Sequence, residues 1–378
     1  MKFTPTVLTP QEEQLRAEVR EFLDAELSPD FRPGLGMGAG ANRDFSKKMA
    51  ARGWLGMAVP KEYGGQDRTA VDRFIVTEEM LSRGAPLGAH FVADRQTAPT
   101  MMKFGTEEQR RFFIPKITAG ELAFSLGMSE PDSGSDLSSV RTAATKVEGG
   151  WLVNGTKVWT SGAHQNDYFV VLCRTAPFDG DRHNGLSQLI VDLRADGVQI
   201  NPIPFLNGGH HFNEVVLSDV FVPDDRVLGE LGSGWSQVTS ELSYERSGPD
   251  RFLSTFGLLK YFIAEHDPAS MTTEQQRVVG QITARYWTIR QLSLSIARTI
   301  DEGGAPAIES ALVKDIGTKF EQQTIALIRD VVDIELDPQQ GTLFELLLAE
   351  ATLAGPSFTL RGGTTEVLRS VASKGLGK

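Results

Sequence analysis

The chain has 378 residues, of which 40% are hydrophobic and 23% are charged, and its net charge is −11. This length exceeds one ordinary hydrophobic core, so several packed subdomains are expected, and the negative charge argues against nucleic acid or an anionic membrane surface as the main partner. The single cysteine, Cys173, excludes an internal disulfide. Because the first residues lack a signal-peptide core and no apolar run could span a bilayer, we expect a cytoplasmic protein without membrane insertion.

The first third of the chain is predicted to be helical. Residues 9–27 have Thr9 as a helix N-cap, Glu12 three residues later and apolar residues at helical spacing, which predicts a capped amphipathic helix. Further helical patterns follow at 43–53, 71–83 and 106–117, with Gly and Pro between them.

The character of the sequence changes twice. From about residue 121 come short runs rich in Val, Ile, Thr and aromatic residues, bounded by Gly, Asn and Asp, which are typical of strands. Within them, EGGWLVNGTKVW predicts a hairpin with its turn at Asn154-Gly155. Helical patterns resume after Gly234. The sequence therefore predicts a helical segment over 1–120, a β segment over 121–230 and a helical segment over 231–378.

Two stretches of the β segment could hold a polar, flat ligand. In AFSLGMSEPDSGSD (123–136), small and hydrogen-bonding residues would let a polar ligand lie against the backbone. In NGTKVWTSGA (154–163), strand alternation places Val158 and Thr160 on one face and Trp159 and Ser161 on the other. A Trp beside a hydroxyl could stack on a ring and hydrogen-bond its edge. An ordinary β-loop and ordinary core packing are the alternatives.

A glutamate lies on an otherwise apolar pattern in GWSQVTSELSYERSGPDRF (234–252). Spacings of three and four predict one continuous helical stripe, formed by Trp235, Val238, Leu242, Glu245, Pro249 and Phe252. A buried carboxylate costs several kcal/mol unless it is paired or neutralised. Glu245 is therefore either the partner of Arg246 in a structural ion pair or a general base whose pKa is raised by an apolar pocket.

Near the end of the chain, LRGGTTEVLR (360–369) interrupts a helical pattern with Gly362 and Gly363. A loop would explain the pair, as would a capping box in which Thr and Glu restart a helix. A ligand that approaches the backbone too closely for any side chain is the third explanation.

Six motifs together resemble the acyl-CoA dehydrogenase family of flavoproteins, in the family's order and over nearly the whole chain. They are GWLGMAVPKEYGG (53–65), FGTEEQRRFFIPKITAGE (104–121), SEPDSGSD (129–136), NGTKVWTSGA (154–163), FNEVVLSDVFVPDDRVLGE (212–230) and RGGTTEVLR (361–369). Each motif alone is weak evidence for the family, but the six motifs in this order are specific to it. The resemblance implies an all-α N-terminal domain, a middle β-barrel or sandwich domain and a C-terminal four-helix-bundle domain.

The resemblance also implies the positions that contact FAD and acyl-CoA, and it implies no metal site. The expected FAD contacts are Leu126, Met128 and Ser129 at the flavin edge, Gly134 and Ser135 in the following loop, Trp159 stacked on the flavin with Ser161 as its hydroxyl partner, and Thr364 and Glu366 after the catalytic loop. The expected acyl-CoA contacts are Ser135, Arg246 and Gly362.

The catalytic base of most of the family is a glutamate in a YEGT-like sequence, and that position here is Gly362. A minority branch, similar to isovaleryl- and long-chain acyl-CoA dehydrogenases, carries the glutamate on the helix after the β domain, directly before an Arg. Glu245-Arg246 falls at that place. The resemblance therefore implies that Glu245 removes the α-proton while a hydride leaves Cβ for the flavin. A backbone N–H at Gly362 would stabilise the thioester oxygen, and the missing side chain would widen the acyl pocket.

Two family elements that reach a neighbouring subunit's FAD are missing. An Arg-x-x-Phe-Gly run is replaced by AEHDPASMTTEQQR (264–277), and a Gly-Gly-x-Gly segment by DIELDPQQGTLFE (333–345). We therefore expect a paralogous partner in an α2β2 complex, as in the actinobacterial dehydrogenases of steroid side chains, whose RGGTTE…GLG endings are similar.

The expected substrate is thus a bulky, steroid-linked acyl-CoA, and the expected electron acceptor is electron-transfer flavoprotein. A homotetrameric short- or branched-chain dehydrogenase, an oxidase and a non-catalytic partner subunit are the alternatives.

Overall fold

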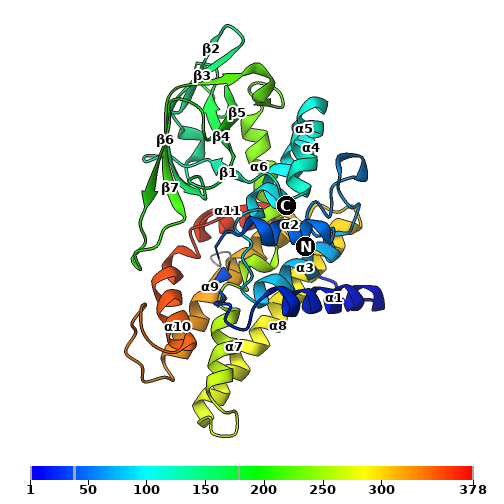
Figure 1. The fold of residues 1–378 in the computed structure, drawn as a ribbon, viewed down its shortest axis with the longest axis vertical. Helices are drawn as coiled ribbons and strands as arrows, with labels where there is room; N and C mark the ends of the chain where they lie inside the picture. The colour runs from blue at the N-terminus through cyan, green and yellow to red at the C-terminus, as the bar shows by residue number, and fades with distance from the viewer. Residues whose placement is uncertain (1, 37–39, 178, 377–378) are drawn as a thin grey trace. The chain divides into compact units, whose positions relative to one another are not determined.

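The computed structural model describes residues 2–36, 40–177 and 179–376, and of residues 241–245 and 376 it describes the backbone alone. Along the chain, helical regions precede and follow the strands of a sheet, as the sequence predicts (Figure 1). Contacts divide the chain into two compact units, one of 1–40, 68–87 and 243–378 and the other of 41–67 and 88–242. The predicted boundaries at 120 and 230 follow changes of sequence pattern instead, and they stay predictions.

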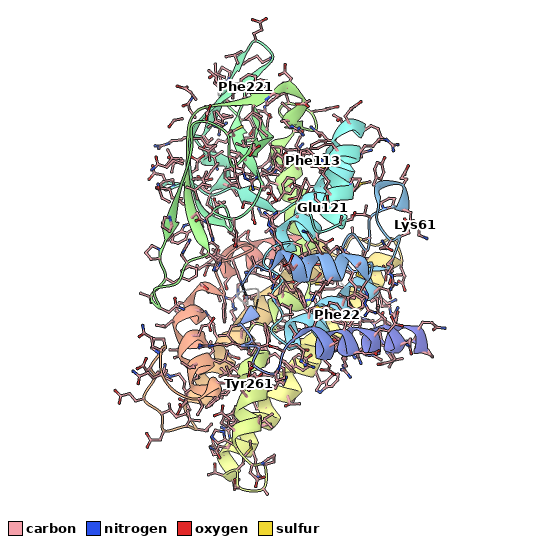
Figure 2. The ribbon with its side chains drawn as sticks, in the orientation of Figure 1. Phe22, Lys61, Phe113, Glu121, Phe221 and Tyr261 are labelled. Carbon is pink, nitrogen blue, oxygen red and sulfur yellow. The ribbon has the colours of Figure 1, made fainter. Side chains whose placement is uncertain are left out.

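The first unit is helical. Its helices are α1 (Pro10–Glu26), α3 (Ala70–Ser82), α7 (Phe256–Glu265), α8 (Thr273–Asp301), α9 (Ala307–Arg329), α10 (Leu343–Ala354) and α11 (Thr365–Leu376). Thr9 and Glu12 form the predicted capping box of α1, and Phe22 lies on the buried face of this helix (Figure 2). Helix α9 contacts both η7 (Gly355–Ser357) and α11, so it positions the chain that precedes and follows the glycine pair.

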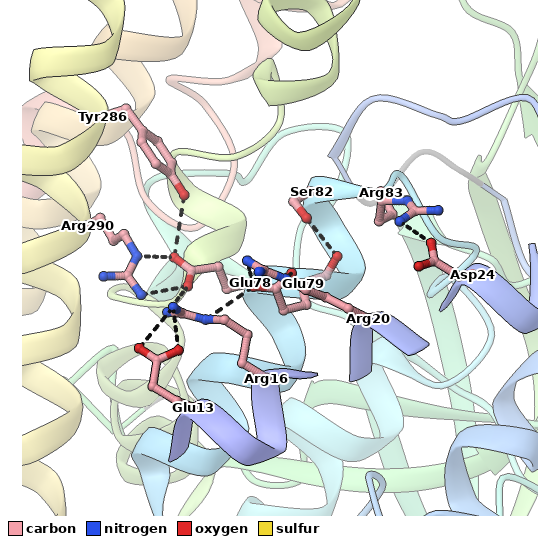
Figure 3. Close-up of polar contacts among 10 residues, drawn as sticks. All are labelled: Glu13, Arg16, Arg20, Asp24, Glu78, Glu79, Ser82, Arg83, Tyr286 and Arg290. Carbon is pink, nitrogen blue, oxygen red and sulfur yellow. Dashed lines mark hydrogen bonds and ion pairs between the residues drawn. The ribbon is translucent and has the colours of Figure 1, made fainter. Parts of the chain in front are cut away.

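Buried ion pairs hold α1, α3 and α8 of this unit together (Figure 3). Arg290 on α8 forms two bonds to the Glu78 carboxylate on α3, at 2.6 and 2.8 Å. Next to it, Glu79 accepts from Arg20 on α1 at 2.8 Å, and Arg16 lies within ion-pair distance of both carboxylates. Because Glu78 and Arg290 are each about 95% buried, these charges depend on one another for their stability.

The second unit is built on a sheet of eight strands. They are β1 (Phe124–Gly127), β2 (Ala143–Val147), β3 (Gly150–Ser161), β4 (Tyr168–Arg174), β5 (Leu186–Asp192), β6 (Val198–Ile203), β7 (Phe212–Pro223) and β8 (Val227–Leu228), in the order β6-β7-β3-β2-β4-β5-β8 with β1 parallel to β4. The helices of this unit are α2 (Arg43–Ala51), α4 (Ala98–Phe104), α5 (Glu107–Thr118) and α6 (Gly234–Glu245).

Strand β4 is buried on both faces, which explains its continuous apolar sequence YFVVLCR. Phe169, Val171 and Cys173 pack into the core between the strands. On the opposite face, Val170 packs with Phe113 of α5, whose ring also meets Phe124 edge-on. The loops on either side of β4 therefore start from a strand that is packed on both faces.

The predicted hairpin turn at Asn154-Gly155 is wrong. Strand β3 passes straight through these residues, and the turn from β2 falls at Glu148-Gly149, where Gly149 has a φ of +74°. Gly155 instead allows a close approach to Thr142, because a Cβ at position 155 would lie 2.7 Å from the Cα of Thr142. The Asn-Gly pair thus marks a close backbone approach and a shift in pairing with β7.

The predicted helical stripe over 235–252 is also shorter than expected. Helix α6 ends at Glu245, so Pro249 and Phe252 lie beyond it, with Pro249 beginning a short 3-10 turn, η6 (Pro249–Arg251). Three residues after the helix ends, Gly248 has the extended conformation that a residue before proline favours, with a φ of −70° and a ψ of 166°, so α6 does not continue into Pro249.

No helix in the described ranges is long and apolar enough to cross a membrane.

Candidate active site

The predicted flavin-edge residues begin at the end of β1, and strand β3 holds their backbone. Lys157 on β3 donates from Nζ to the carbonyl oxygen of Met128 at 3.0 Å. The N–H of Val158 donates to the carbonyl oxygen of Ser129 at 2.9 Å. The Met128 side chain packs against one buried apolar cluster. The half-buried Leu126 side chain packs against a second apolar cluster. The main chain at 128–129 is therefore fixed from two sides.

A buried ion pair lies directly behind this loop. Lys157 Nζ is 2.8 Å from Oε1 of Glu130, and the lysine is fully buried. Glu130 also accepts the backbone N–H groups of Arg141 and Thr142, at 2.6 and 2.9 Å. Burial alone would raise the pKa of Glu130, but Lys157 and these donors lower it overall, and burial lowers the pKa of Lys157.

Sequence reasoning missed this pair. Strand alternation could not have found it, because the pairing with β7 shifts between Val153 and Gly155.

Gly134 and Ser135 lie at the exposed tip of the loop that follows. Glu130 and Ser133 exchange backbone hydrogen bonds of 2.8 and 3.1 Å, which closes the base of the loop. A Cβ at Gly134 would meet nothing within 4 Å. The predicted contacts at 134 and 135 are thus open to a ligand that lies over the loop.

Trp159 combines backbone strain with exposure. Its φ is +60°, which is an outlier for a bulky side chain, and 58% of the residue is exposed. The strand alternation predicted here is interrupted, because the pairing with β7 shifts between Lys157 and Thr160 and both of these residues are fully buried. Phe212 meets the Trp159 ring edge-on at 6.0 Å. Strain of this kind concentrates at ligand sites, since the fold maintains it at a cost.

Ser161, the last residue of β3, lies at the same edge. Its side chain is half-buried, and its carbonyl oxygen accepts from the Ser125 hydroxyl of β1 at 2.8 Å.

In the helical unit, Gly362 and Gly363 form a turn between η7 (Gly355–Ser357) and α11. Their φ angles are +65° and +97°, a region that favours glycine. Thr364 caps α11, because its hydroxyl accepts the N–H of Val367 and its carbonyl accepts that of Leu368. The capping box is not formed, since the third helical residue is Val367 and Glu366 precedes it. Glu366 is exposed, and its own backbone N–H and the Thr364 hydroxyl lower its pKa.

Buried charges surround the glycine turn. Lys314 on α9 is fully buried and donates from Nζ to the carbonyl oxygen of Gly363. A Cβ at Gly362 would lie 3.2 Å from both terminal nitrogens of Arg251, which is 2% exposed and ion-paired to Asp250 at 3.0 Å. Sequence reasoning missed Arg251 and Lys314.

Arg246 lies beside the turn, whereas the side chain of Glu245 is outside the described residues. A Cβ at Gly363 would be 3.8 Å from Nη2 of Arg246. The backbone of Glu245 forms the last residue of α6, directly before Arg246. The structure thus brings Arg246 and Gly362-Gly363 together in the helical unit, and Leu126–Ser129, Trp159 and Ser161 share the β unit.

The described residues contain no group of three or more His, Cys, Asp or Glu side chains that could hold a metal ion.

Comparison with known proteins gives consistent matches along the chain. Residues 9–121 match the family model for the acyl-CoA dehydrogenase N-terminal domain, and residues 125–220 match that for the middle domain. Acyl-CoA dehydrogenase FadE26 of Mycobacterium tuberculosis is 33% identical, with 96% of each chain covered. Acyl-CoA dehydrogenase IpdE1 of the same organism is also 33% identical, with the same coverage.

Two solved structures are similar over nearly the whole chain. A structure described as the Tcur3481-Tcur3483 steroid ACAD has a TM-score of 0.87 at 28% identity, covering 98% of each chain. The ChsE4-ChsE5 complex from Mycobacterium tuberculosis has a TM-score of 0.86 at 32% identity, covering 99% of each chain.

Proposed function

Because the chain belongs to the acyl-CoA dehydrogenase family, we propose that it is the base-bearing subunit of an α2β2 enzyme that dehydrogenates a bulky, steroid-linked acyl-CoA. The general activity is that of the family, an oxidoreductase acting on an acyl-CoA. The substrate, the assembly and the residues below are the proposed part.

The described residues fit FAD. The strained, exposed ring of Trp159 offers a stacking face, and the fixed backbone at 128–129 offers hydrogen-bonding groups beside Ser161. We assign the FAD contacts to these residues, to Leu126, Gly134 and Ser135, and to Thr364 and Glu366 after the glycine turn. FAD, when bound, would accept the hydride from the substrate Cβ.

Glu245 is the proposed base. The observation that carries this assignment is the glycine turn, where Arg251 crowds any side chain at 362 and Arg246, the neighbour of Glu245, lies beside Gly363. A side chain at position 362 is thus disfavoured by its φ and crowded by Arg251, and Glu245 directly precedes Arg246 in the sequence. Glu245 would remove the α-proton, and Arg246 and Gly362 would contact the acyl-CoA.

The glycine turn would also stabilise the thioester oxygen. As the α-proton leaves, negative charge builds on this oxygen, and a preorganised backbone N–H at Gly362 would donate to it. Donors of this type contribute on the order of 3 kcal/mol to lowering the barrier.

The assembly is inferred from the missing elements and from the relatives. The segments at 264–277 and 333–345 lack the runs that would reach a neighbour's FAD. Similar solved structures are described as a steroid ACAD and as a complex of two differently named chains. A paralogous partner would supply the missing contacts, and electron-transfer flavoprotein would accept the electrons.

The proposed function is tested by anaerobic flavin reduction with a panel of CoA thioesters. The purified holoenzyme is mixed with steroid side-chain CoA esters and with isovaleryl-CoA, and the loss of oxidised flavin absorbance is followed. We expect fast reduction by steroid esters and reoxidation by electron-transfer flavoprotein. Preferential reduction by isovaleryl-CoA would favour the branched-chain alternative, fast reoxidation by oxygen would indicate an oxidase, and no reduction by any thioester would reject the proposal.

A further inference from the structure

Buried groups hold Arg361 and Gly363, and a third buried group lies beside Gly362 between them. Arg361 pairs with Glu321 of α9 at 3.2 Å and donates to the hydroxyl of Ser254 at 2.6 Å. The Cβ direction of Gly362 faces the Arg251 guanidinium, and the Gly363 carbonyl accepts from Lys314. A turn of two glycines would otherwise sample many conformations, so these contacts select one of them.

Lys314 makes the contact that acts directly on the turn's peptide plane. Its ammonium is fully buried, and the bond to the Gly363 carbonyl is charge-assisted, a type about twice as strong as a neutral hydrogen bond. Because a peptide unit is planar, a fixed Gly363 carbonyl also fixes the N–H of Thr364, which belongs to the same unit, and restricts rotation about the Cα–C bond of Gly363. Lys314 thereby fixes the C-terminal end of the turn, while Glu321 and Ser254 hold Arg361 at the other end, so the Gly362 N–H between them is restricted from both sides.

Glu321 belongs to the same face of α9 as Lys314. Its carboxylate is fully buried and accepts the N–H of Ser254 at 2.7 Å, and burial raises its pKa. Ala311, Lys314, Thr318, Glu321 and Ile325 are all buried and are spaced alternately by three and four residues. The two charges therefore occupy core positions of this helix, where an apolar residue would serve if packing alone were needed.

We propose that Lys314 is a positioning residue for the reaction, which holds the Gly362-Gly363 turn so that its backbone N–H points at the thioester oxygen. Arg251 complements it by limiting position 362 to glycine. This inference rests on the proposed function of the turn. It adds a residue that touches neither substrate nor FAD and acts through the Gly363 carbonyl.

The test compares Lys314→Met with Lys319→Met in the FAD-loaded holoenzyme. Lys319 lies on the same helix and pairs with Asp315 at 2.9 Å, so its loss removes a lysine charge from α9 without removing the bond to Gly363. Three quantities are measured: hydrogen exchange of the amides at 362–368 relative to those of α9, the limiting rate of flavin reduction by the acyl-CoA that works best in the panel above, and the dissociation constant of that acyl-CoA.

We expect Lys314→Met to raise exchange at 362–368 about tenfold and to lower the limiting rate about 10- to 100-fold, the range expected for a misplacement near 1 Å. The dissociation constant of the acyl-CoA should change less than about threefold, because the lost contact acts on the transition state. Lys319→Met should behave as wild type in all three measurements. Unchanged exchange and rate in Lys314→Met would overturn the proposal.

The exchange pattern and a second variant distinguish poor folding of Lys314→Met from the loss of a positioning contact. Lys314→Gln removes the buried charge but keeps a polar side chain, and the same turn-specific increase is expected. An increase spread evenly over α9 and the turn in both variants would mean general destabilisation and would overturn the positioning role. Failure of the proposed function is a separate result, since it requires that wild-type flavin is not reduced by any thioester.

Discussion

At the scale of single residues, the turn at Gly362 explains why the base is expected elsewhere in this chain. The sequence interpretation was that a side chain is absent because its function moved to Glu245 and that the gap leaves room for substrate. The structure adds that the Cβ direction at 362 faces the Arg251 guanidinium at 3.2 Å. A glutamate introduced at 362 would first have to displace this buried cation, so it is expected to crowd the turn and not to restore a base.

Gly362→Ala is predicted to destabilise the protein and slow turnover. The φ of +65° costs an L-residue about 1 kcal/mol or more, and the new methyl group would press on Arg251. Gly280→Ala is the matched control, because Gly280 is exposed on α8 and a Cβ there meets nothing within 4 Å. It should stabilise by about 0.5–1 kcal/mol. Urea unfolding measures the free energy of unfolding of both variants, and equal changes in this free energy would contradict the assigned role of Gly362.

The charged residues behind the site are the part of it that a single sequence conceals. Lys157 and Glu130 are 27 positions apart, and Lys314 and Gly363 are 49 positions apart, so neither contact follows from local pattern. The spacing of Lys314 and Glu321 on the buried face of α9 resembles the signal that identified Glu245. That spacing could have identified both residues as buried, but not what they contact.

At the scale of elements, local signals predicted the helix starts well. The box at Thr9 depends on residues three apart and is present, and the pattern predicted at 106–117 corresponds to α5, which begins at Glu107. The hairpin prediction failed because Asn154-Gly155 is a strong turn signal whose actual cause is tertiary, the approach of Thr142. The end of α6 at Glu245 was missed because the apolar spacing continued to Pro249 and Phe252, which lie beyond the helix.

The Glu78–Arg290 pair is predicted to determine how firmly α3 and α8 pack. Glu78→Gln would leave the Arg290 guanidinium buried without its carboxylate, which costs about 3–5 kcal/mol. Glu13→Gln is the control, since Glu13 pairs with Arg16 at the surface of α1 (Figure 3) and surface pairs contribute below about 1 kcal/mol. Thermal unfolding compares the stability of the two variants. A similarly small loss of stability in both would show that the buried pair is dispensable.

His90 is predicted to make stability depend on pH. It is fully buried, with Nδ1 2.7 Å from the Ser46 hydroxyl of α2, and burial lowers its pKa from 6.5 to about 4. As pH falls below about 6.5, the unfolded chain binds a proton that the folded chain refuses, so stability is lost between about pH 6.5 and 4, by up to about 3 kcal/mol. Denaturant titrations at several pH values measure this loss. His90→Gln should remove that part of the slope, and an identical slope in the variant would reject the assignment.

At the scale of the whole molecule, the fold class was the most predictable property. Six short motifs in order indicated a sheet between helical regions, and the strand order and family matches agree with it. The grouping of α1 and α3 with the C-terminal helices was not predicted. It depends on contacts such as Glu12 with Arg298, which are 286 positions apart.

Native mass spectrometry is predicted to separate the heteromeric assembly from a homotetramer. Expressed alone, the chain should not form a tetramer that retains four FAD, because each site would lack the contacts missing at 264–277 and 333–345. Co-expressed with a paralogous subunit, it should form α2β2 with one FAD per αβ pair. A stable homotetramer with four FAD would support the homotetrameric alternative instead.

The measurement that tests the central claim most directly is anaerobic flavin reduction in Glu245→Gln. With Glu245 as the base, the holoenzyme variant should keep its FAD and its affinity for acyl-CoA, while the rate of flavin reduction falls by about 10²- to 10⁴-fold. A Glu245→Gln holoenzyme that is reduced by acyl-CoA at the wild-type rate would contradict the account.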